Sequence, residues 1–465
     1  MKNPFLPLPT MLLLHPAQLE LTHHLRASRV AVAGGCIALN GPLNEKALRQ
    51  AVQHLPVLFD VFRWQFDPAC TNLPVTVGTG YELPELPLLD FSREPNPQQT
   101  ADAWLQQRQL SAFCTNFHPF FDLVLLRLSA TEHRLLVRGH QLLLDDTGCD
   151  RLMSGIARTY TRIIEGDGLP DPVPAYAGEV AAAQFYNNSL AYVEDEAHWQ
   201  REFTELPQTL FPHRNYDLIA PLPYRFAASD SLSRTLRQAA TVLNESPDYL
   251  LMAALTLFFA RINNQAVCTF GRVVAGRQIK SQFPVVGRFD RLLPIRLRYQ
   301  PELSLRLLVQ RIRRQHRSDN SHRHFPMSHL SRTLGAVRSC LFDVLIQQQP
   351  APSALTMPDL ICQTTRLAPS GVYAPLHICW QEGSTHQPAG LQVSGLPNYI
   401  SEGDARSLLV QTEHLLADFA RRPDVPIASF EVLPRFIREY LSGRAGHCFT
   451  DKRISEPARL SVPGH

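Results

Sequence analysis

The stretch from Gly139 to Gly148, with the sequence GHQLLLDDTG, combines side chains that could assist a proton transfer. His140 and Gln141 stand before three leucines, and Asp145 and Asp146 follow them. A histidine can act as a general base near neutral pH, whereas a glutamine amide does not titrate and can only donate or accept hydrogen bonds. The stretch therefore predicts either a working catalytic loop or a loop that has lost its base.

The composition of the whole chain limits what this stretch can belong to. With 465 residues, 45% of them hydrophobic and 19% charged, the chain is globular and has room for two or three domains or one two-lobed fold. The net charge of +3 comes from 45 basic and 42 acidic residues, so it indicates no nucleic-acid partner.

The cysteines and the apolar segments bear on compartment and partners. Nine scattered cysteines without a CxxC pair favour reduced, buried thiols in a cytoplasmic protein over a zinc site or a disulfide scaffold. The apolar N-terminus is interrupted by prolines 4, 7 and 9, which favours an extended arm over a signal peptide. No apolar run reaches the roughly 18 residues of a membrane span. We expect a monomer without membrane association.

The first part of the chain alternates between strand and helix patterns. Apolar residues at helical spacing predict helices over residues 43–55, 100–113 and 149–166, with Asn44 as the cap of the first. Strands are predicted over 30–39 and 57–66, and a hairpin over 121–144 turns at 130–132. The opening stretch ends the second strand of this hairpin.

A proline-rich segment over residues 167–180 is predicted to link two parts of similar style. We place the first lobe at residues 1–170, the second at 171–441 and a loose tail at 442–465. The second lobe has predicted helices over 186–203, 246–264, 301–317 and 402–423, and strands over 266–277, 341–350 and 376–382.

Several short segments, taken in order, resemble the condensation domains of nonribosomal peptide synthetases. These segments are LHPAQ (14–18), GPLNEKALRQAV (41–52), PVLFDVF (56–62), HQLLLDD (140–146), VVAGRQIKSQFPVVGRFDRLLPIR (273–296), HFPMSHL (324–330), FDVLIQQQP (342–350) and GLQVSGLPNYI (390–400). They cover nearly the whole chain. The resemblance extends to the chloramphenicol-acetyltransferase-like acyltransferase superfamily, to which these domains belong.

The resemblance implies an α/β fold of two chloramphenicol-acetyltransferase-like lobes, arranged as a V around a central tunnel. It further implies that an acyl or peptidyl carrier protein delivers substrates in trans as phosphopantetheine thioesters, or that CoA carries them, to a small-molecule acceptor. We expect no bound cofactor and no metal.

The family's HHxxxDG motif aligns residue by residue with HQLLLDD. His140 takes the first histidine, Gln141 the second, Asp145 the aspartate and Asp146 the glycine. In the family the second histidine orients or deprotonates the acceptor amine, the aspartate pairs with an arginine, and the glycine leaves room for substrate. The resemblance makes Arg277 the expected partner of Asp145.

Three features keep two interpretations each. His140 is either a base or, as we favour, a buried core histidine. Asp146 is either the cap of the helix at Gly148 or a side chain that enters the tunnel. The basic cluster over residues 311–324, where His322 and His324 alternate as on a strand, either docks an acidic carrier or a phosphate or, as we favour, is a solvated helix face.

Two functions fit these observations. The first is a free-standing condensation-domain-like protein of secondary metabolism that forms an amide or ester bond, with Gln141 orienting the nucleophile. The second is an inactive module that recruits tailoring enzymes, similar to the oxygenase-recruiting X domains, which also replace the second histidine and carry an aspartate for the glycine. An open tunnel favours the enzyme, and a plugged tunnel favours the module.

Overall fold

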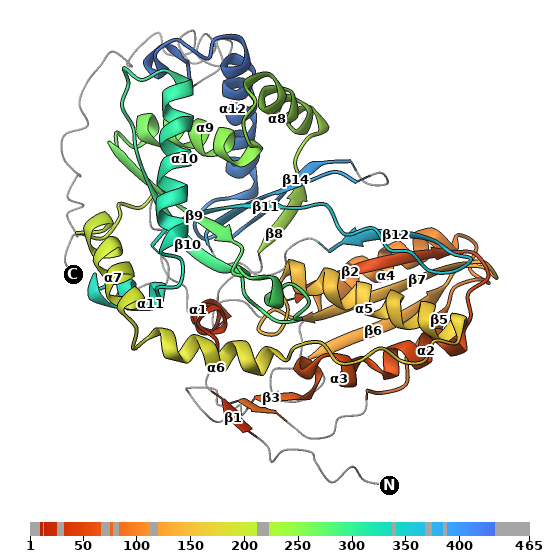
Figure 1. The fold of residues 1–465 in the computed structure, drawn as a ribbon. Coiled ribbons are helices and arrows are strands. Elements are labelled where there is room, and N and C mark those ends of the chain that lie inside the picture. Colours follow the sequence, from red (N-terminus) through yellow and green to blue (C-terminus); the bar gives the residue numbers. More distant parts are fainter. Residues whose placement is uncertain are drawn as a thin grey trace, which may run out of the picture.

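The computed structural model describes residues 10–12, 14–25, 32–66, 75–77, 83–111, 120–211, 223–336, 341–367, 374–384 and 388–432. Two large β-sheets, each backed by helices, form two lobes that meet as a V (Figure 1). The predicted α/β fold with two lobes is therefore confirmed. The loose tail predicted over 442–465 lies outside the described residues.

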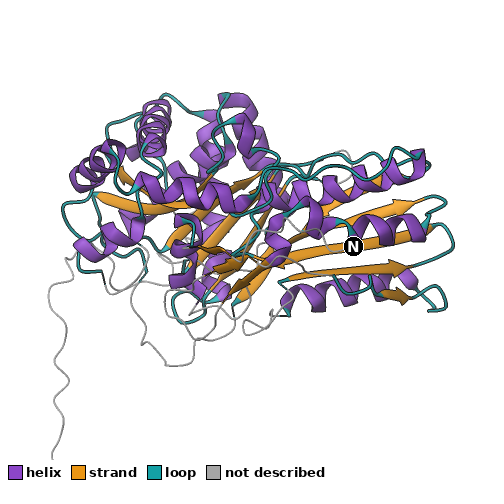
Figure 2. Cartoon of the chain, turned by 60° about the horizontal axis from the view of Figure 1, so that its bottom comes forward, coloured by secondary structure: helices purple, strands orange, loops and turns teal. Residues whose placement is uncertain are grey.

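The first lobe is a five-stranded sheet between helices (Figure 2). Its order is β12 (Ile361–Arg366), β2 (Val32–Asn40), β7 (Glu132–His140), β6 (Phe121–Arg127) and β5 (Leu88–Asp90). The helices α2 (Glu45–Gln53) and α5 (Asp146–Glu165) share a buried core with one face, and α4 (Pro97–Leu110) packs on the other. Alternate residues of β7 enter these two cores, as the period of a strand requires.

The second lobe is a six-stranded sheet with helices on its outer face. Its order is β10 (Arg291–Arg298), β9 (Val267–Val274), β11 (Val344–Gln349), β13 (Leu376–Gln381), β14 (Gly390–Gly395) and β8 (Tyr224–Ala227). The largest apolar core joins this sheet to α8 (Asp230–Leu243), α9 (Pro247–Ile262), α10 (Leu305–Ser321) and α12 (Glu402–Arg421). The almost uniformly apolar α9 is buried on nearly all sides, as predicted for such a helix.

Two segments connect the lobes. The helices α6 (Tyr176–Tyr186) and α7 (Leu190–Glu202) run from the first lobe to the second (Figure 1). The strand β12 returns from the second half of the chain and pairs antiparallel with β2. The first lobe therefore contains residues from both sides of the division placed at residue 170.

Smaller elements surround the junction of the lobes. A three-stranded sheet consists of β1 (Thr10–Leu12), β4 (Val75–Val77) and β3 (Trp64–Phe66). The helix α1 (Pro16–Leu25) contributes Leu21 to an apolar cluster with Leu142 of the first lobe and Phe342 and Leu345 of the second. The remaining elements are α11 (Met327–Thr333) and the 3₁₀ turns η2 (Lys280–Gln282) and η3 (Ile427–Ser429).

The strand predicted over residues 57–66 is wrong for most of its length. The structure has a short helix α3 (Leu55–Leu58), a 3₁₀ turn η1 (Asp60–Arg63) and only then the short strand β3. The Asp60 carboxylate accepts hydrogen bonds from the backbone N–H groups of Tyr176 and Ala177, at 2.8 and 2.9 Å. The turn thus caps the first residues of α6, a tertiary role that the local sequence does not show.

Three further boundaries differ from the prediction. The helix α6 begins at Tyr176, inside the linker predicted over residues 167–180. The helix predicted over 186–203 is interrupted, because Ser189 caps a separate helix α7. Since α10 continues to Ser321 and His322 is its C-cap, His322 and His324 do not alternate on a strand.

Candidate active site

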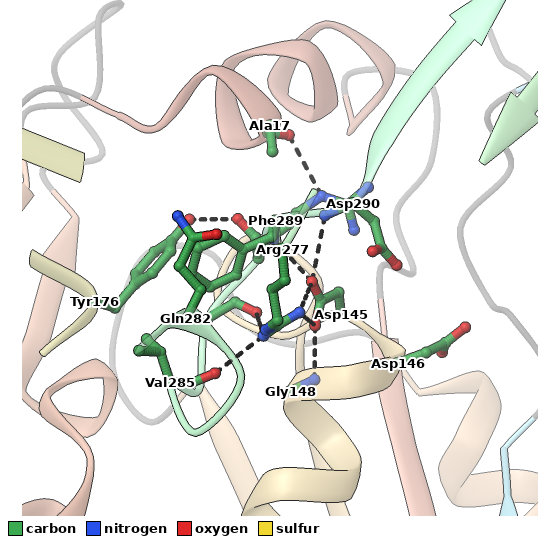
Figure 3. A network of polar contacts seen from close by, with 12 residues as sticks. Ala17, Asp145, Asp146, Gly148, Tyr176, Arg277, Gln282, Val285, Phe289 and Asp290 are labelled. Carbon is green, nitrogen blue, oxygen red and sulfur yellow. Dashed lines mark hydrogen bonds and ion pairs between the residues drawn. The ribbon is translucent and has the colours of Figure 1, made fainter. Parts of the chain in front are cut away.

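The motif loop, defined as residues 140–148, lies where the two lobes meet. Its first residue, His140, ends β7, and its last residues begin α5. The helix α1 holds the loop from one side, because the buried Gln18 amide donates a hydrogen bond of 2.7 Å to the carbonyl oxygen of Leu142. The second lobe faces the loop with the segment from Arg277 to Asp290 (Figure 3).

Asp145 is the N-cap of α5, and its carboxylate accepts the hydrogen bonds that join the motif loop to the second lobe. Its carboxylate accepts hydrogen bonds from the backbone N–H groups of Gly148 at 2.7 Å and Phe289 at 2.8 Å. Arg277 donates to both of its oxygens, at 3.0 and 2.8 Å. Although burial opposes ionisation, the charge of Arg277 and these hydrogen bonds hold the pKa of Asp145 below its ordinary value. The ion pair that the sequence predicts is thus present.

Arg277 and Gly148 fit closely into this arrangement. Arg277 also donates to the carbonyl oxygens of Val285 and Gly287, at 3.0 and 3.2 Å. A Cβ atom on Gly148 would stand 2.9 Å from the carbonyl oxygen of Gly287 and 3.0 Å from Oδ1 of Asp145. A glycine is therefore required for the backbones of the two lobes to approach this closely.

His140 is buried and held as a core residue. Its Nδ1 accepts a hydrogen bond of 3.2 Å from the backbone N–H of Leu142, and its ring meets Phe120 edge-on at 5.8 Å. Burial and the nearby Arg288 lower its pKa to about 4. Because Nδ1 is engaged and the lowered pKa makes the ring a weak base, the geometry favours the core histidine over the base.

Gln141 occupies the position where the resemblance places the functional histidine. Its side chain is buried, and its amide donates a hydrogen bond of 3.1 Å to the carbonyl oxygen of Val32 at the start of β2. Arg288 donates to the carbonyl oxygen of Gln141 at 3.4 Å. This amide can orient a ligand by a hydrogen bond, but it cannot take a proton.

Asp146 is the first residue of α5, and its carboxylate reaches the second lobe. It accepts a hydrogen bond of 2.9 Å from the Gln347 side chain and lies 3.8 Å from the Arg366 guanidinium. The interpretation of Asp146 as the helix cap is wrong, because Asp145 performs that role. The other interpretation, a side chain that enters the space between the lobes, agrees with this geometry.

Comparison with known proteins decides the family. The family described as "Condensation domain" matches residues 10–366. The chain belongs to the condensation-domain family. A dimodular nonribosomal peptide synthase of Bacillus subtilis (strain 168) is 22% identical over 85% of this chain, which spans 17% of that relative's length. Enterobactin synthase component F of Escherichia coli (strain K12) is 26% identical over 71% of this chain, which spans 26% of that relative's length.

Solved structures agree with this condensation-domain fold. A mutant of the starter condensation domain of rhizomide synthetase, in complex with C8-CoA, matches with a TM-score of 0.77 and 19% identity, over 91% of this chain and 98% of that one. The X-domain in its complex with OxyB from teicoplanin biosynthesis matches with a TM-score of 0.74 and 17% identity, over 93% and 99% of the two chains.

The central cavity of this condensation domain is small. Its volume is about 30 Å³, and its lining includes Gln141, Asp146, Arg288, Asp290 and Gln347. A space of this size holds about one water molecule. Sequence reasoning missed Arg288, Asp290 and Gln347 as lining residues, although all three fall within the segments that resemble the family.

The basic cluster lies on the outer side of the same condensation domain. Arg311, Arg314 and Arg317 are exposed on α10 and form a solvated helix face, whereas Arg313, His316, His322, Arg323 and His324 of the same cluster are half-buried. Arg311 and Arg314 also line an open groove of about 480 Å³ beside β10. Within the described ranges, no group of histidine, cysteine and acidic side chains could hold a metal ion, and no helix is long and apolar enough to cross a membrane.

Proposed function

We propose that this condensation domain joins an acyl or aminoacyl thioester to an amine or a hydroxyl, forming an amide or an ester. The thioester would be carried by the phosphopantetheine of a partner carrier protein or by CoA. The observation that carries the proposal is the framework of Asp145 and Arg277, which holds the motif loop at the junction of the lobes. Gln141, in this loop, is one of the residues that line the central cavity.

Positioning would supply most of the rate enhancement. Holding the acceptor nitrogen or oxygen against the thioester carbonyl can contribute roughly 7–11 kcal/mol to lowering the barrier. Gln141 would orient the acceptor by a hydrogen bond and would leave the transfer of its proton to another group. The site is therefore atypical for the family, since its motif position lacks a titratable side chain.

The small cavity bears on how substrates could reach the site. The contact between Asp146 of the first lobe and Gln347 of the second crosses the space in which substrates would have to meet. We infer that these side chains separate, or that the lobes move apart, when a substrate binds. Such closure and opening are common in enzymes that exclude water during the reaction.

The same observation favours a second candidate function. A space for about one water molecule, lined by the hydrogen-bonded side chains of Asp146 and Gln347, suits a module that carries out no acyl transfer. One protein of similar fold, the X-domain from teicoplanin biosynthesis, is in complex with OxyB. In this alternative the surface of the domain would recruit a tailoring enzyme or a synthetase partner.

Turnover on defined substrates tests the first function. The protein would be incubated with acyl- and aminoacyl-loaded carrier proteins or CoA thioesters and with amine and hydroxyl acceptors, and products would be followed by mass spectrometry. We expect Gln141→Ala and Asp146→Ala to change turnover, while Asp171→Asn on the exposed linker leaves it unchanged.

Two outcomes would count against parts of this proposal. Product formation that neither site variant alters would show that the motif loop is not the site. If no pair of substrates yields product and a pulldown retains a tailoring enzyme, the recruiting module is the correct function.

A further inference from the structure

Asp290 brings a carboxyl group from the second lobe to the cavity that Gln141 lines from the first. It directly precedes β10, and its half-buried side chain forms part of the cavity wall. Its backbone N–H donates to Asp145 at 3.3 Å, which fixes the residue beside the motif loop. Figure 3 shows the side chains of Asp290 and Asp146 projecting to the same side, away from Arg277.

The three carboxylates near this cavity differ in what they bind. Asp145 is engaged by Arg277 and by backbone N–H groups. Asp146 accepts a hydrogen bond from Gln347. For the Asp290 carboxylate, the described part of the chain shows no hydrogen bond or ion pair. Asp290 is thus the carboxylate that can accept a proton from a ligand without giving up a structural contact.

We propose that Asp290 is the general base of this condensation domain. It takes the role of the second histidine of the family's motif, whose position is occupied here by Gln141. The inference rests on the proposed acyl transfer and names the group that receives the acceptor's proton. It follows from the shared cavity: Gln141 orients the acceptor from one lobe, and Asp290 meets its N–H or O–H from the other.

The proposed step balances without any further reactant. The acceptor nitrogen attacks the thioester carbonyl carbon, so that a C–N bond forms and the C–S bond breaks. The Asp290 carboxylate takes one proton from the nitrogen during the attack. It then returns this proton to the departing sulfur, which leaves as a free thiol. With a hydroxyl acceptor the same sequence gives an ester.

The electrostatic surroundings of Asp290 suit a base. Burial raises its pKa well above the ordinary value, and the charges of Asp145 and Asp146 raise it further, while Arg277 and Arg288 oppose them. These four are the charged groups that face it from α5 and from the segment before β10. A carboxylate with a raised pKa is a stronger base than an exposed one, so Asp290 binds a proton more readily than an ordinary aspartate.

A pH–rate profile of variants at residue 290 tests the proposal. Single-turnover transfer would be measured with a hydroxyl acceptor, which does not titrate between pH 4 and pH 9. In the wild type the rate should rise with pH, because only the ionised carboxylate accepts a proton, and should level above the raised pKa of Asp290. Asp290→Asn should lower the plateau rate by roughly 10²-fold or more and remove this rise.

Two further variants serve as controls. Asp290→Glu retains the carboxyl group and should recover most of the rate together with the pH-dependent rise. Asp171→Asn removes an exposed carboxylate far from the cavity and should leave the profile of the wild type unchanged. Circular dichroism would confirm that the Asp290 variants are folded, so that a lost rate reports on chemistry.

The outcomes separate this inference from the function on which it rests. If the wild type forms product and Asp290→Asn keeps both its rate and its pH-dependent rise, the role of Asp290 is overturned while the acyl transfer stands. A rate that falls in Asp290→Asn with an unchanged pH profile also overturns it, because a structural effect would produce that result. A wild type without turnover on any substrate overturns both proposals.

Discussion

Arg277 of the second lobe donates two hydrogen bonds, of 3.0 and 2.8 Å, to the carboxylate of Asp145 in the first lobe. Their side chains are 3% and 1% exposed, so water cannot replace either partner. The pair connects a helix N-cap of one lobe to the loop before β10 of the other. The two lobes are therefore coupled at the position where the motif loop begins α5.

Removing Arg277 should destabilise the protein strongly. Arg277→Met leaves the Asp145 carboxylate buried without its cation, which typically costs about 3–5 kcal/mol of unfolding free energy. Urea denaturation followed by circular dichroism would measure this change. The control is Arg421→Met, which breaks an ion pair whose arginine is 73% exposed and should cost less than about 1 kcal/mol. Equal losses in the two variants would contradict the central role of the Asp145 pair.

The burial of His140 should make stability depend on pH. Its pKa is lowered to about 4 in the folded protein, whereas an unfolded histidine titrates near 6.5. Since the unfolded chain binds the proton more tightly, the stability associated with neutral His140 is complete above pH 6.5. It falls by about 1.4 kcal/mol per pH unit as the pH decreases toward 4.

The variant His140→Gln should reduce this slope. A glutamine keeps a hydrogen-bond acceptor but does not titrate. The slope of the unfolding free energy between pH 6.5 and pH 4.5 should therefore be smaller by the contribution of one proton, about 1.4 kcal/mol per pH unit. Urea denaturation at several pH values would measure it. Other histidines with lowered pKa values keep part of the slope: His15, His133, His316, His324, His329 and His377. An unchanged slope would show that His140 does not stay neutral in the folded protein.

Local sequence signals could predict much of the fold. The helices α2, α5 and α12 follow apolar residues at helical spacing, α9 follows a continuous apolar run, and Asn44 caps α2 as its position suggests. The hairpin of β6 and β7 follows two apolar runs around a polar turn. The pairing of Asp145 with Arg277 could be predicted because each stands within a segment that resembles the family.

Contacts between distant segments could not be predicted in this way. The partners of Asp146 come from strands far along the chain. Gln347, which lines the cavity, donates to the Asp146 side chain across 201 positions, and Arg366 donates to the carbonyl oxygen of Asp146 across 220. The turn at Asp60 is shaped by its contact with α6, 116 residues away. The local periodicity of the sequence does not indicate which of these polar side chains will be in contact. For the same reason, sequence reasoning missed Asp290 as a residue of the cavity.

Gly148 should not tolerate a side chain. In Gly148→Ala the new methyl group would stand 2.9 Å from a backbone oxygen of the facing lobe, which cannot move alone. Overpacking of this kind typically costs about 1–3 kcal/mol. The matched control is Gly178→Ala in α6, where a Cβ atom meets nothing within 4 Å and should stabilise the helix by roughly 0.5–1 kcal/mol. Thermal unfolding of both variants would show shifts of opposite sign, and a tolerated Gly148→Ala would mean that the lobes are not in contact here.

A histidine at residue 141 should restore transfer when Asp290 is disabled. Gln141→His returns a titratable side chain to a position that lines the cavity. In an Asp290→Asn background it should raise single-turnover acyl transfer by about 10²-fold and restore a pH-dependent rise. In the wild-type background the gain should be much smaller, since the Asp290 carboxylate already accepts the proton. Mass spectrometry of the products would measure the rate in both backgrounds. Equal gains in the two backgrounds would mean that residues 141 and 290 act independently.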